Sequence, residues 1–329
     1  AGRAGGRGAA MTARLIQMSG VIVDLIYRVE AVPEPGTEAI VQGFSVAAGG
    51  GFNAMVAARR MGIAVAHAGT LGTGPFADIA HAAMVREGID WIGVRLAGRD
   101  QGLCTVLTDA GGERSFIAAE GADGVVTDAD LARLDPGAQD WHLLSGYALH
   151  YPQSRAALVR WLRARPPRLV FDPSPVIAAI PEGARQAALS AALWVSANRA
   201  EGAVLTGLSD PAAIAAALAE GRPTEGGAIL RDGARGCHLA LPGQAPVHLP
   251  GFAVRAVDTN GAGDAHTGAF IAMLAQGADA ERAARIANVC AALSTTKEGP
   301  STAPDLNTVL VAMGETPGTR DRQGDTSPA

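Results

Sequence analysis

Short apolar runs alternate with helix-like segments along most of this 329-residue chain. The runs are short enough for strands, and the Ala-rich segments between them space apolar residues by three and four positions, as one helix face requires. Strand-like runs occupy residues 15–23, 64–68, 141–144, 169–171, 193–196 and 228–230, and helix-like segments include 77–87, 154–163 and 211–219. The alternation predicts an α/β fold, a three-layer α/β/α sandwich with a mainly parallel central sheet.

Two stretches break this alternation and predict additional strands. Residues 38–46 and 102–117 carry β-type patterns where a helical segment would be expected. Within the second stretch, residues 109–112 read DAGG, which is the composition of a hairpin turn. We therefore expect a β-hairpin here that the βα repeat does not account for.

Composition limits the possible partners. Hydrophobic residues make up 48% of the chain, enough for a large core, and a net charge of -5 disfavours nucleic acid or an anionic membrane as a partner. No apolar run reaches membrane-spanning length. Residues 1–10 lack the apolar stretch of a signal peptide, and we expect them to form a disordered leader. We expect the polar residues 314–329 to form a disordered tail, which leaves one domain over residues 11–313.

The cysteines, histidines and lysine argue against several kinds of site. Cys104, Cys237 and Cys290 are far apart and odd in number, so we expect reduced, buried thiols in a cytoplasmic protein. The seven histidines form no cluster with ligand spacing, which disfavours a zinc site. Lys297 is the only lysine and does not follow a glycine, so a Walker-type phosphate loop is absent.

Residues 258–270, which read DTNGAGDAHTGAF, carry the strongest functional signal. Gly261, Ala262 and Gly263 let the backbone turn tightly before a helix-like segment, so several amide N–H groups can point into one cavity. The positive end of the helix dipole suits a phosphate there. Asp264 would compete with that anion unless it contacts a hydroxyl that attacks the phosphate. The alternative is a capped helix in which Asp264 only complements the dipole.

This segment resembles the C-terminal signature of the ribokinase-like (PfkB-type) carbohydrate kinases. Other motifs similar to those of the family follow in the expected order: Asp24 after the first strand-like run, GGGFN at 49–53, NRAE at 198–201 and RDGARG at 231–236. The resemblance covers about residues 15–310. It implies a small β-sheet lid that covers the sugar, which we place at about residues 36–46 and 96–120.

Phosphoryl transfer, which the resemblance implies, gives each motif a role. We expect Asp264 to accept the proton of the attacking hydroxyl, and the amides of Gly261, Ala262 and Gly263 to form an anion hole. The resemblance implies that the sugar is bound by Asp24, Gly49, Gly50 and Asn53. It places the nucleotide near Asn198, Glu201, Arg231, Gly233, Gly236 and Asn288.

Several of these residues also have plainer interpretations. Asn198 and Glu201 would share a helix face, where Glu201 holds Mg²⁺ through water, or they form a capping box. Asp24 is also compatible with a turn at a strand end. Asn53 is compatible with a helix N-cap, and Asn288 with an ordinary exposed helical position.

Two positions depart from the family pattern. His266 lies two positions beyond Asp264 on the predicted helix, faces away from the chemistry, and is expected to be structural. Gly50 stands where ribokinase itself and the members that act on phosphosugars often carry a lysine. A positive group for an existing sugar phosphate is therefore missing there, although Arg28 or Arg114 would be able to replace it.

A monovalent cation is expected beside the anion hole. In several relatives the carboxylate matching Asp258 holds such an ion with backbone carbonyls from the position of Asn260 and from a loop matching residues 295–301. We therefore expect potassium as an activator. The alternative is that Lys297 places its own ammonium near Asp258.

The sequence thus predicts an ATP- and Mg²⁺-dependent kinase that phosphorylates a hydroxymethyl group of a small, free sugar. One alternative is a nucleoside kinase of the same fold, although aromatic residues make up only 4% of the chain and leave few rings for a base. Another is an inactive protein that senses sugar or nucleotide. The exposed apolar face of the lid predicts a homodimer through the lid.

Overall fold

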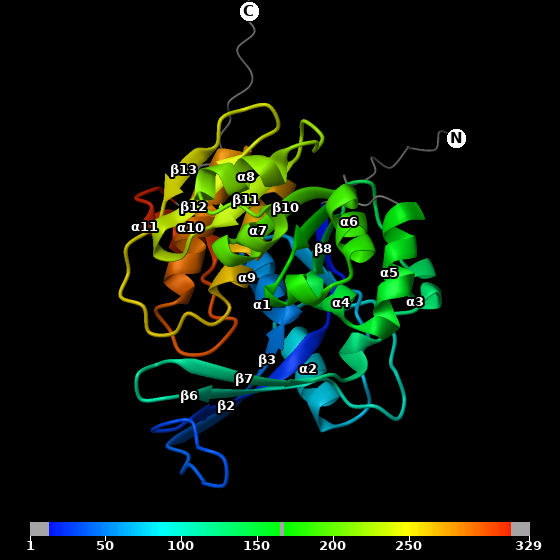
Figure 1. The fold of residues 1–329 in the computed structure, drawn as a ribbon, viewed down its shortest axis with the longest axis vertical. Coiled ribbons are helices and arrows are strands. Elements are labelled where there is room, and N and C mark those ends of the chain that lie inside the picture. The colour runs from blue at the N-terminus through cyan, green and yellow to red at the C-terminus, as the bar shows by residue number, and fades with distance from the viewer. Residues whose placement is uncertain (1–12, 165–167, 317–329) are drawn as a thin grey trace, which may run out of the picture.

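The main sheet holds nine strands within residues 13–164 and 168–316, the part of the chain that the computed structural model describes (Figure 1). Their order is β13-β12-β11-β10-β9-β8-β1-β4-β5, and neighbours are parallel except for the antiparallel pairs β11–β12 and β12–β13. The predicted α/β fold with a mainly parallel sheet is confirmed. The strands are β1 (Arg14–Gln17), β4 (Ala64–His67), β5 (Asp90–Trp91), β8 (Trp141–Ser145), β9 (Arg168–Asp172), β10 (Ala192–Asn198), β11 (Gly227–Arg231), β12 (Gly236–Ala240) and β13 (Val247–Pro250).

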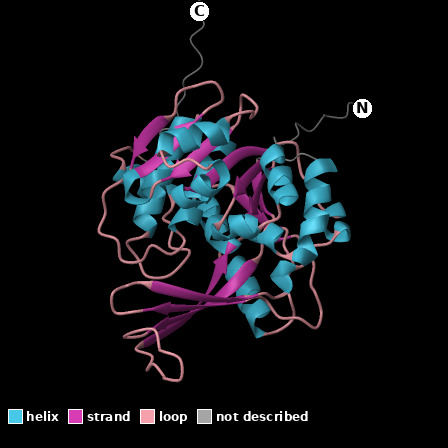
Figure 2. Ribbon diagram, in the orientation of Figure 1, coloured by secondary structure: helices cyan, strands magenta, loops and turns pink. Residues whose placement is uncertain are grey.

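Helices cover both faces of this sheet (Figure 2). Adjacent strand residues point to opposite faces, so Leu15 and Leu143 belong to one buried cluster while Ile16 and Leu144 belong to the other. The first cluster includes α1 (Gly51–Arg60), α2 (Pro75–Arg86), α9 (Ala262–Ala275), α10 (Ala280–Ser294) and α11 (Leu306–Ala312). The second is packed by α3 (Asp128–Ala132), α4 (Gly146–His150), α5 (Pro152–Ala164), α6 (Glu182–Ala191), α7 (Arg199–Thr206) and α8 (Pro211–Ala219).

A separate four-stranded sheet forms the lid, below the main sheet in Figure 1. Its order is β3-β2-β6-β7, with β2 and β6 parallel and the other pairs antiparallel. The predicted hairpin turn joins β6 to β7, and Asp109 N donates to Glu113 O across it at 3.0 Å. The lid strands are β2 (Val21–Arg28), β3 (Gly43–Gly50), β6 (Leu103–Thr108) and β7 (Arg114–Ala119).

The strand predicted at residues 15–23 and the predicted start of the lid at residue 36 were wrong. Residues 15–23 form no single strand: the chain leaves the main sheet after β1 and enters the lid as β2, with residues 18–20 between them. Apolar residues lie on both sides of this break because both strands have buried faces, so the pattern predicts one strand. Residues 36–42 carry no strand, and the lid strand nearest to them, β3, begins only at Gly43.

Asp123 ties the base of the lid together. It lies in the 3-10 helix η1 (Ala122–Gly124), is 4% exposed, and its Oδ1 accepts from Gly102 N at 2.8 Å and from Gly121 N at 3.1 Å. The two glycines precede β6 and follow β7, respectively. A Cβ on Gly121 would lie 2.0 Å from Gly102 N, so only glycine permits this approach.

The chain ends were predicted only in part. The predicted leader, residues 1–10, lies outside the described residues, as does most of the predicted tail. Glu315 lies within the described part and its Oε2 pairs with Arg282 Nη2 at 2.8 Å, so the packed structure extends beyond residue 313.

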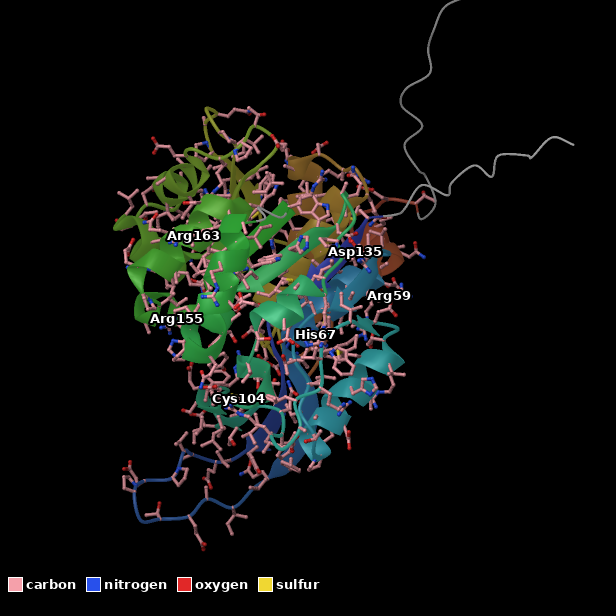
Figure 3. All side chains as sticks on the ribbon, turned by 90° about the vertical axis from the view of Figure 1, so that its right-hand side faces the viewer. Arg59, His67, Cys104, Asp135, Arg155 and Arg163 are labelled. Carbon is pink, nitrogen blue, oxygen red and sulfur yellow. The ribbon has the colours of Figure 1, made fainter. Side chains whose placement is uncertain are left out.

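The three cysteines are free and buried, as expected. Figure 3 labels Cys104, which lies on lid strand β6. Burial raises the pKa of the Cys104 thiol to about 11 and those of Cys237 and Cys290 to about 12, so none is a ready nucleophile. Among the described residues no single helix is long and apolar enough to cross a bilayer; only α7 and α8 taken together meet that test, with a 61° bend between them.

Candidate active site

The GAG segment opens helix α9 as the sequence predicted. Gly261 is the N-cap residue and has φ 74°, a left-handed conformation that glycine adopts without strain. The first hydrogen bond of the helix runs from Ala265 N to Gly261 O at 2.8 Å. The preceding amides therefore lie at the open N-terminal end of a 14-residue helix, where an anion would be stabilised.

Asp264 lies in the first turn of α9 and is held by Asn53. The Asn53 Nδ2 atom donates to Asp264 Oδ2 at 3.0 Å, and its Oδ1 accepts from Ser301 Oγ at 2.7 Å. Asn53 is buried inside α1, whose N-cap is Gly50, so the interpretation of Asn53 as an N-cap was wrong. The sequence assigned Asn53 to the sugar, whereas the structure places it against the proposed base.

Asp24 faces the same space from the lid. It lies inside β2 and is 6% exposed, so it is not at a strand-end turn. Within the residues that the structure describes, no protein group donates a hydrogen bond to its carboxylate. Burial, and then the charge of Asp264, raises the pKa of Asp24 to about 7. A Cβ on Gly49 would lie 2.3 Å from Asp24 Oδ2, so glycine is required beside this carboxylate.

Arg231 joins the carboxyl ends of three neighbouring strands. Asp172, Asn198 and Arg231 are the last residues of β9, β10 and β11. The Arg231 Nη1 atom donates to Asp172 Oδ2 at 2.9 Å and to Thr267 Oγ1 of α9 at 2.6 Å. Its Nη2 atom lies 3.4 Å from Glu201 Oε2. The guanidinium thus lies beneath the start of α9, among carboxylates.

Asn198 and Glu201 form a capping box at the start of α7. Glu201 N donates to Asn198 Oδ1 at 2.8 Å, and Asn198 N donates to Glu201 Oε2 at 2.8 Å. The plainer interpretation of this pair is therefore correct as geometry. Glu201 is nevertheless 4% exposed, and burial followed by the charge of Asp172 raises its pKa to about 7. A residue that only caps a helix does not need to be buried, so the burial of Glu201 is not explained by capping alone.

The remaining nucleotide-side residues fall into two groups. Gly233 and Gly236 have φ 60° and 96° in the turn around the 3-10 helix η3 (Gly233–Arg235), next to the end of β11. Asn288 is buried: its Oδ1 accepts from His266 Nε2 at 3.1 Å, and its Nδ2 donates to Leu249 O at 3.1 Å. It is therefore not an exposed helical position. His266 is buried between α9 and α10, as expected for a structural histidine.

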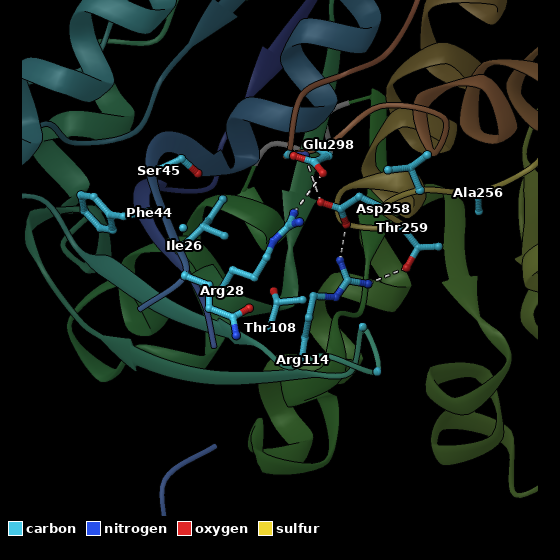
Figure 4. A pocket seen from close by; sticks show the side chains of 16 residues that line it. Ile26, Arg28, Phe44, Ser45, Thr108, Arg114, Ala256, Asp258, Thr259 and Glu298 are labelled. Carbon is cyan, nitrogen blue, oxygen red and sulfur yellow. Dashed lines mark hydrogen bonds and ion pairs between the residues drawn. The ribbon is translucent and has the colours of Figure 1, made fainter. Parts of the chain in front are cut away.

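The surroundings of Asp258 do not fit the expected monovalent cation. Asp258 Oδ1 accepts from Arg114 Nη1 at 2.6 Å, and its Oδ2 accepts from Gly299 N at 3.0 Å (Figure 4). The Thr295 carbonyl, which belongs to the loop expected to supply ligands, accepts instead from Val257 N at 2.7 Å and from Asp258 N at 3.0 Å. Lys297 is exposed and forms no ion pair with Asp258.

The site residues thus gather from both sheets, and some were missed. The anion-hole residues, Asp264, Asp24, Gly49 and Asn53 lie together between the lid and α9. Asp172 and Ser301 were not predicted. Asp172 ends a parallel strand, which is a signal for a binding site at the carboxyl edge, but a single aspartate has no spacing pattern to support it.

The acidic cluster fits a magnesium ion bound together with phosphates. The carboxylates of Asp172, Glu201 and Asp264 face one guanidinium, and the charge of Asp172 raises the pKa of both other groups after burial does. A divalent cation would relieve this excess of negative charge. Among the described residues no group of three or more His, Cys, Asp or Glu is arranged to hold a metal. Glu201 is the residue that would hold Mg²⁺ there, through water and together with phosphate oxygens.

Comparisons with known proteins agree with this geometry. The family described as pfkB family carbohydrate kinase matches residues 15–307. The ATP-dependent ribose-1-phosphate kinase of Halopiger xanaduensis is 31% identical over 307 residues, which cover 92% of this chain and 98% of that protein.

Solved structures show the same fold. The ribokinase of Arabidopsis thaliana complexed with ribose and ATP has a TM-score of 0.77 at 21% identity, and the match covers 92% of this chain and 99% of that one. A putative ribokinase II of Escherichia coli in complex with ATP and Mg²⁺ has a TM-score of 0.74 at 21% identity, with the same coverage of both chains. The chain therefore belongs to the pfkB family of carbohydrate kinases and is an ATP-dependent sugar kinase, as its motifs predicted.

Proposed function

We propose that the protein transfers the γ-phosphoryl group of ATP to a hydroxymethyl group of a small, free sugar, with Asp264 as the base. One observation carries this proposal. Asp264 lies in the first turn of α9, beside the Gly261 turn at the N-terminal end of the helix and in the field of the unpartnered Asp24 carboxylate. A base, an anion hole and a hydroxyl-binding group are thus adjacent.

The sugar would lie between the lid and α9. Ionised Asp24 offers acceptors for two hydroxyl groups, and Gly49 and Gly50 leave room for the ring beside it. Asn53 holds Asp264 through the bond to Oδ2, which leaves Oδ1 free to accept the proton of the attacking hydroxyl. The amides at 261–263 would stabilise the charge that builds on the phosphoryl oxygens in the transition state; Ala262 N would first have to release Thr259 O, to which it donates at 3.3 Å.

The nucleotide would lie over the carboxyl ends of β10 and β11. The glycine turn at 233–236 would approach its phosphates, and the Arg231 guanidinium, which pairs with Asp172 and Glu201, would balance charge close to the anion hole. Bound Mg²⁺ would neutralise charge on the β- and γ-phosphates. Asn198, Glu201 and Arg231 form one bonded group, so we propose that they position the metal-bearing phosphates rather than contact the sugar.

A free sugar is favoured over a phosphosugar because the lid cations are already paired. Arg28 Nη2 lies 3.0 Å from Glu298 Oε1, and Arg114 Nη1 lies 2.6 Å from Asp258 Oδ1. A substrate phosphate would have to break one of these pairs. Potassium is left out of this proposal, since Arg114 occupies the carboxylate that was expected to bind it.

We propose a homodimer through the lid, which the exposure of four apolar lid side chains supports; these are Phe44, Val46, Phe116 and Ile117. We also propose a cytoplasmic location, which the three unpaired thiols support.

The test is a coupled assay of ADP release by wild type and by Asp264→Asn. The panel contains ribose, fructose, ribose-1-phosphate, adenosine and inosine. We expect turnover of a free sugar by wild type and a loss of about a thousandfold or more in kcat for the variant, because an amide cannot take the proton. Asp279→Asn, at the exposed N-cap of α10, is the matched control and should retain full activity because asparagine also caps helices.

Three outcomes would contradict the proposal. Near-normal kcat in folded Asp264→Asn would remove this residue from the mechanism. Preference for adenosine or inosine would favour a nucleoside kinase. No turnover of any compound, with binding retained, would favour a sensing protein.

A further inference from the structure

Arg114 lies on lid strand β7, and its side chain contacts Asp258 and Thr259, just before the Gly261 turn. We propose that its guanidinium supplies at Asp258 the positive charge that a monovalent cation would otherwise supply, and so positions the anion-hole turn without potassium. This inference rests on the proposed function, because it assigns the turn at 261–263 to phosphate binding.

The geometry of Arg114 is that of a two-point anchor. Its Nη1 atom donates to Asp258 Oδ1 at 2.6 Å, and its Nη2 atom donates to the Thr259 hydroxyl (Figure 4). The planar guanidinium fork thereby binds two consecutive residues. The Arg114 and Asp258 side chains are 21% and 25% exposed, so solvent screens this pair less than a surface ion pair.

Hydrogen bonds connect Asp258 to the residues of the anion hole. Its Oδ1 also accepts from Asn260 N at 2.9 Å, one residue before Gly261. Ala262 N in turn donates to Thr259 O at 3.3 Å. Residues 258–262 therefore form one bonded turn with Arg114 at its outer side. Arg114 is a positioning residue in this arrangement, since it touches the loop rather than the proposed reacting atoms.

The position beside Asp258 Oδ1 that a potassium ion would take is held by the Arg114 guanidinium. Both oxygens of Asp258 accept from protein donors, and the Thr295 carbonyl accepts from two amides. A cation beside Asp258 Oδ1 would overlap the guanidinium, so its binding would require Arg114 to leave. The charge on Asp258 is neutralised by the guanidinium instead.

Arg28 provides a matched control on the same lid. It also crosses the cleft, where its Nη2 atom lies 3.0 Å from Glu298 Oε1, but these side chains are 55% and 67% exposed. Among the described residues, Arg28 makes no hydrogen bond or ion pair with the turn at 258–262. Removal of Arg28 therefore deletes a lid arginine without touching the proposed anchor.

The experiment compares wild type, Arg114→Ala and Arg28→Ala in potassium, sodium and tetramethylammonium chlorides at matched ionic strength. We expect equal rates for wild type in all three salts. Arg114→Ala should lose about tenfold or more in kcat/KM for ATP in tetramethylammonium, as expected for loss of charge-assisted bonds. Added potassium or guanidinium ion should restore much of that loss. Arg28→Ala should show no such response to cations.

A second measurement does not depend on turnover. The melting temperature of the unliganded proteins is followed as potassium replaces tetramethylammonium. Wild type and Arg28→Ala should show no specific response, whereas Arg114→Ala should gain stability because the ion can then enter. Specific activation or stabilisation of wild type by potassium would overturn the proposal, as would an Arg114→Ala variant that potassium neither activates nor stabilises. If wild type turns over no sugar, the proposed function fails, and the melting experiment still decides the role of Arg114.

Discussion

Three carboxyl groups of the site are harder to ionise in the folded protein than in the unfolded chain. The pKa values of Asp24 and Glu201 are raised to about 7 and that of Asp264 to about 6, in each case mainly by burial. A raised pKa means that the folded state binds protons which the unfolded state has released. Ionisation of these groups therefore lowers stability as the pH rises from about 4 to about 7. Ionisation of the unliganded site therefore lowers the free energy of unfolding at the pH at which Asp264 must be ionised to act as a base.

Asp24→Asn should reveal this cost. The variant removes the buried charge, so its free energy of unfolding relative to wild type should increase by about 2–3 kcal/mol between pH 5 and pH 8. Its KM for sugar should rise, because an amide binds a pair of hydroxyls less well. Urea unfolding of the unliganded proteins across this pH range checks the first expectation. Asp279→Asn, which removes an exposed charge, is the control; curves for Asp24→Asn and wild type that stay parallel from pH 5 to pH 8 would refute it.

Single residues could be predicted where a motif has spacing and could not where it has none. The Gly261 turn and Asp264 were found because small residues, a carboxylate and a helix pattern occur together. Arg114 was considered only as a phosphate-binding residue, because nothing in its local sequence indicates that it contacts Asp258, 144 positions away. Asn53 was assigned to the sugar because sequence cannot tell whether an amide faces a ligand or the base.

Among the elements, α7 begins with a capping box that also belongs to the acidic cluster. A cap residue normally stabilises a helix start by about 1 kcal/mol. Here Glu201 also lies 3.4 Å from Arg231, between the strand ends and the proposed phosphate site. The two interpretations of this pair are therefore compatible, and they can be separated by changing charge without changing hydrogen bonding.

Glu201→Gln makes this separation. The amide oxygen can still accept from Asn198 N, so the helix cap should largely survive. The lost charge should raise the Mg²⁺ concentration needed for half-maximal activity several-fold while the KM for sugar changes little. Asn198→Ala is the converse control, which removes the cap bond but leaves the Glu201 charge. If the magnesium titration of Glu201→Gln overlays that of wild type, Glu201 caps the helix and has no role in binding Mg²⁺.

The base of the lid depends on one buried carboxylate. Asp123→Ala would leave the amides of Gly102 and Gly121 without their acceptor, so we expect a loss of roughly 2–4 kcal/mol in stability. Asp123→Asn keeps an acceptor oxygen and should lose much less. Thermal unfolding ranks the three proteins, and hydrogen exchange over residues 103–119 should rise in Asp123→Ala. Equal exchange in all three would show that Asp123 does not hold the lid base.

For the whole molecule, the βα alternation was sufficient to predict the three layers but not the division of the chain between two sheets. β1 and β2 are consecutive in sequence and lie in different sheets, and apolar periodicity is the same on both sides of residues 18–20. The antiparallel strands β12 and β13 were missed because they extend the sheet by a hairpin rather than by the repeat. Sheet membership depends on contacts between distant segments, which a local pattern does not contain.

The lid joins the main domain at one end only, through the connections near residues 20, 50, 102 and 121. Its strands come from short stretches of chain, while α9 and the ends of β9, β10 and β11 belong to the other sheet and its helices. Substitutions on β2, β3, β6 and β7 can thus alter the sugar that is accepted without rebuilding the machinery for phosphoryl transfer. Substrate choice and chemistry can therefore evolve at different rates in such a protein. Arg114 is the exception, because it lies on a lid strand and contacts the residues before the Gly261 turn.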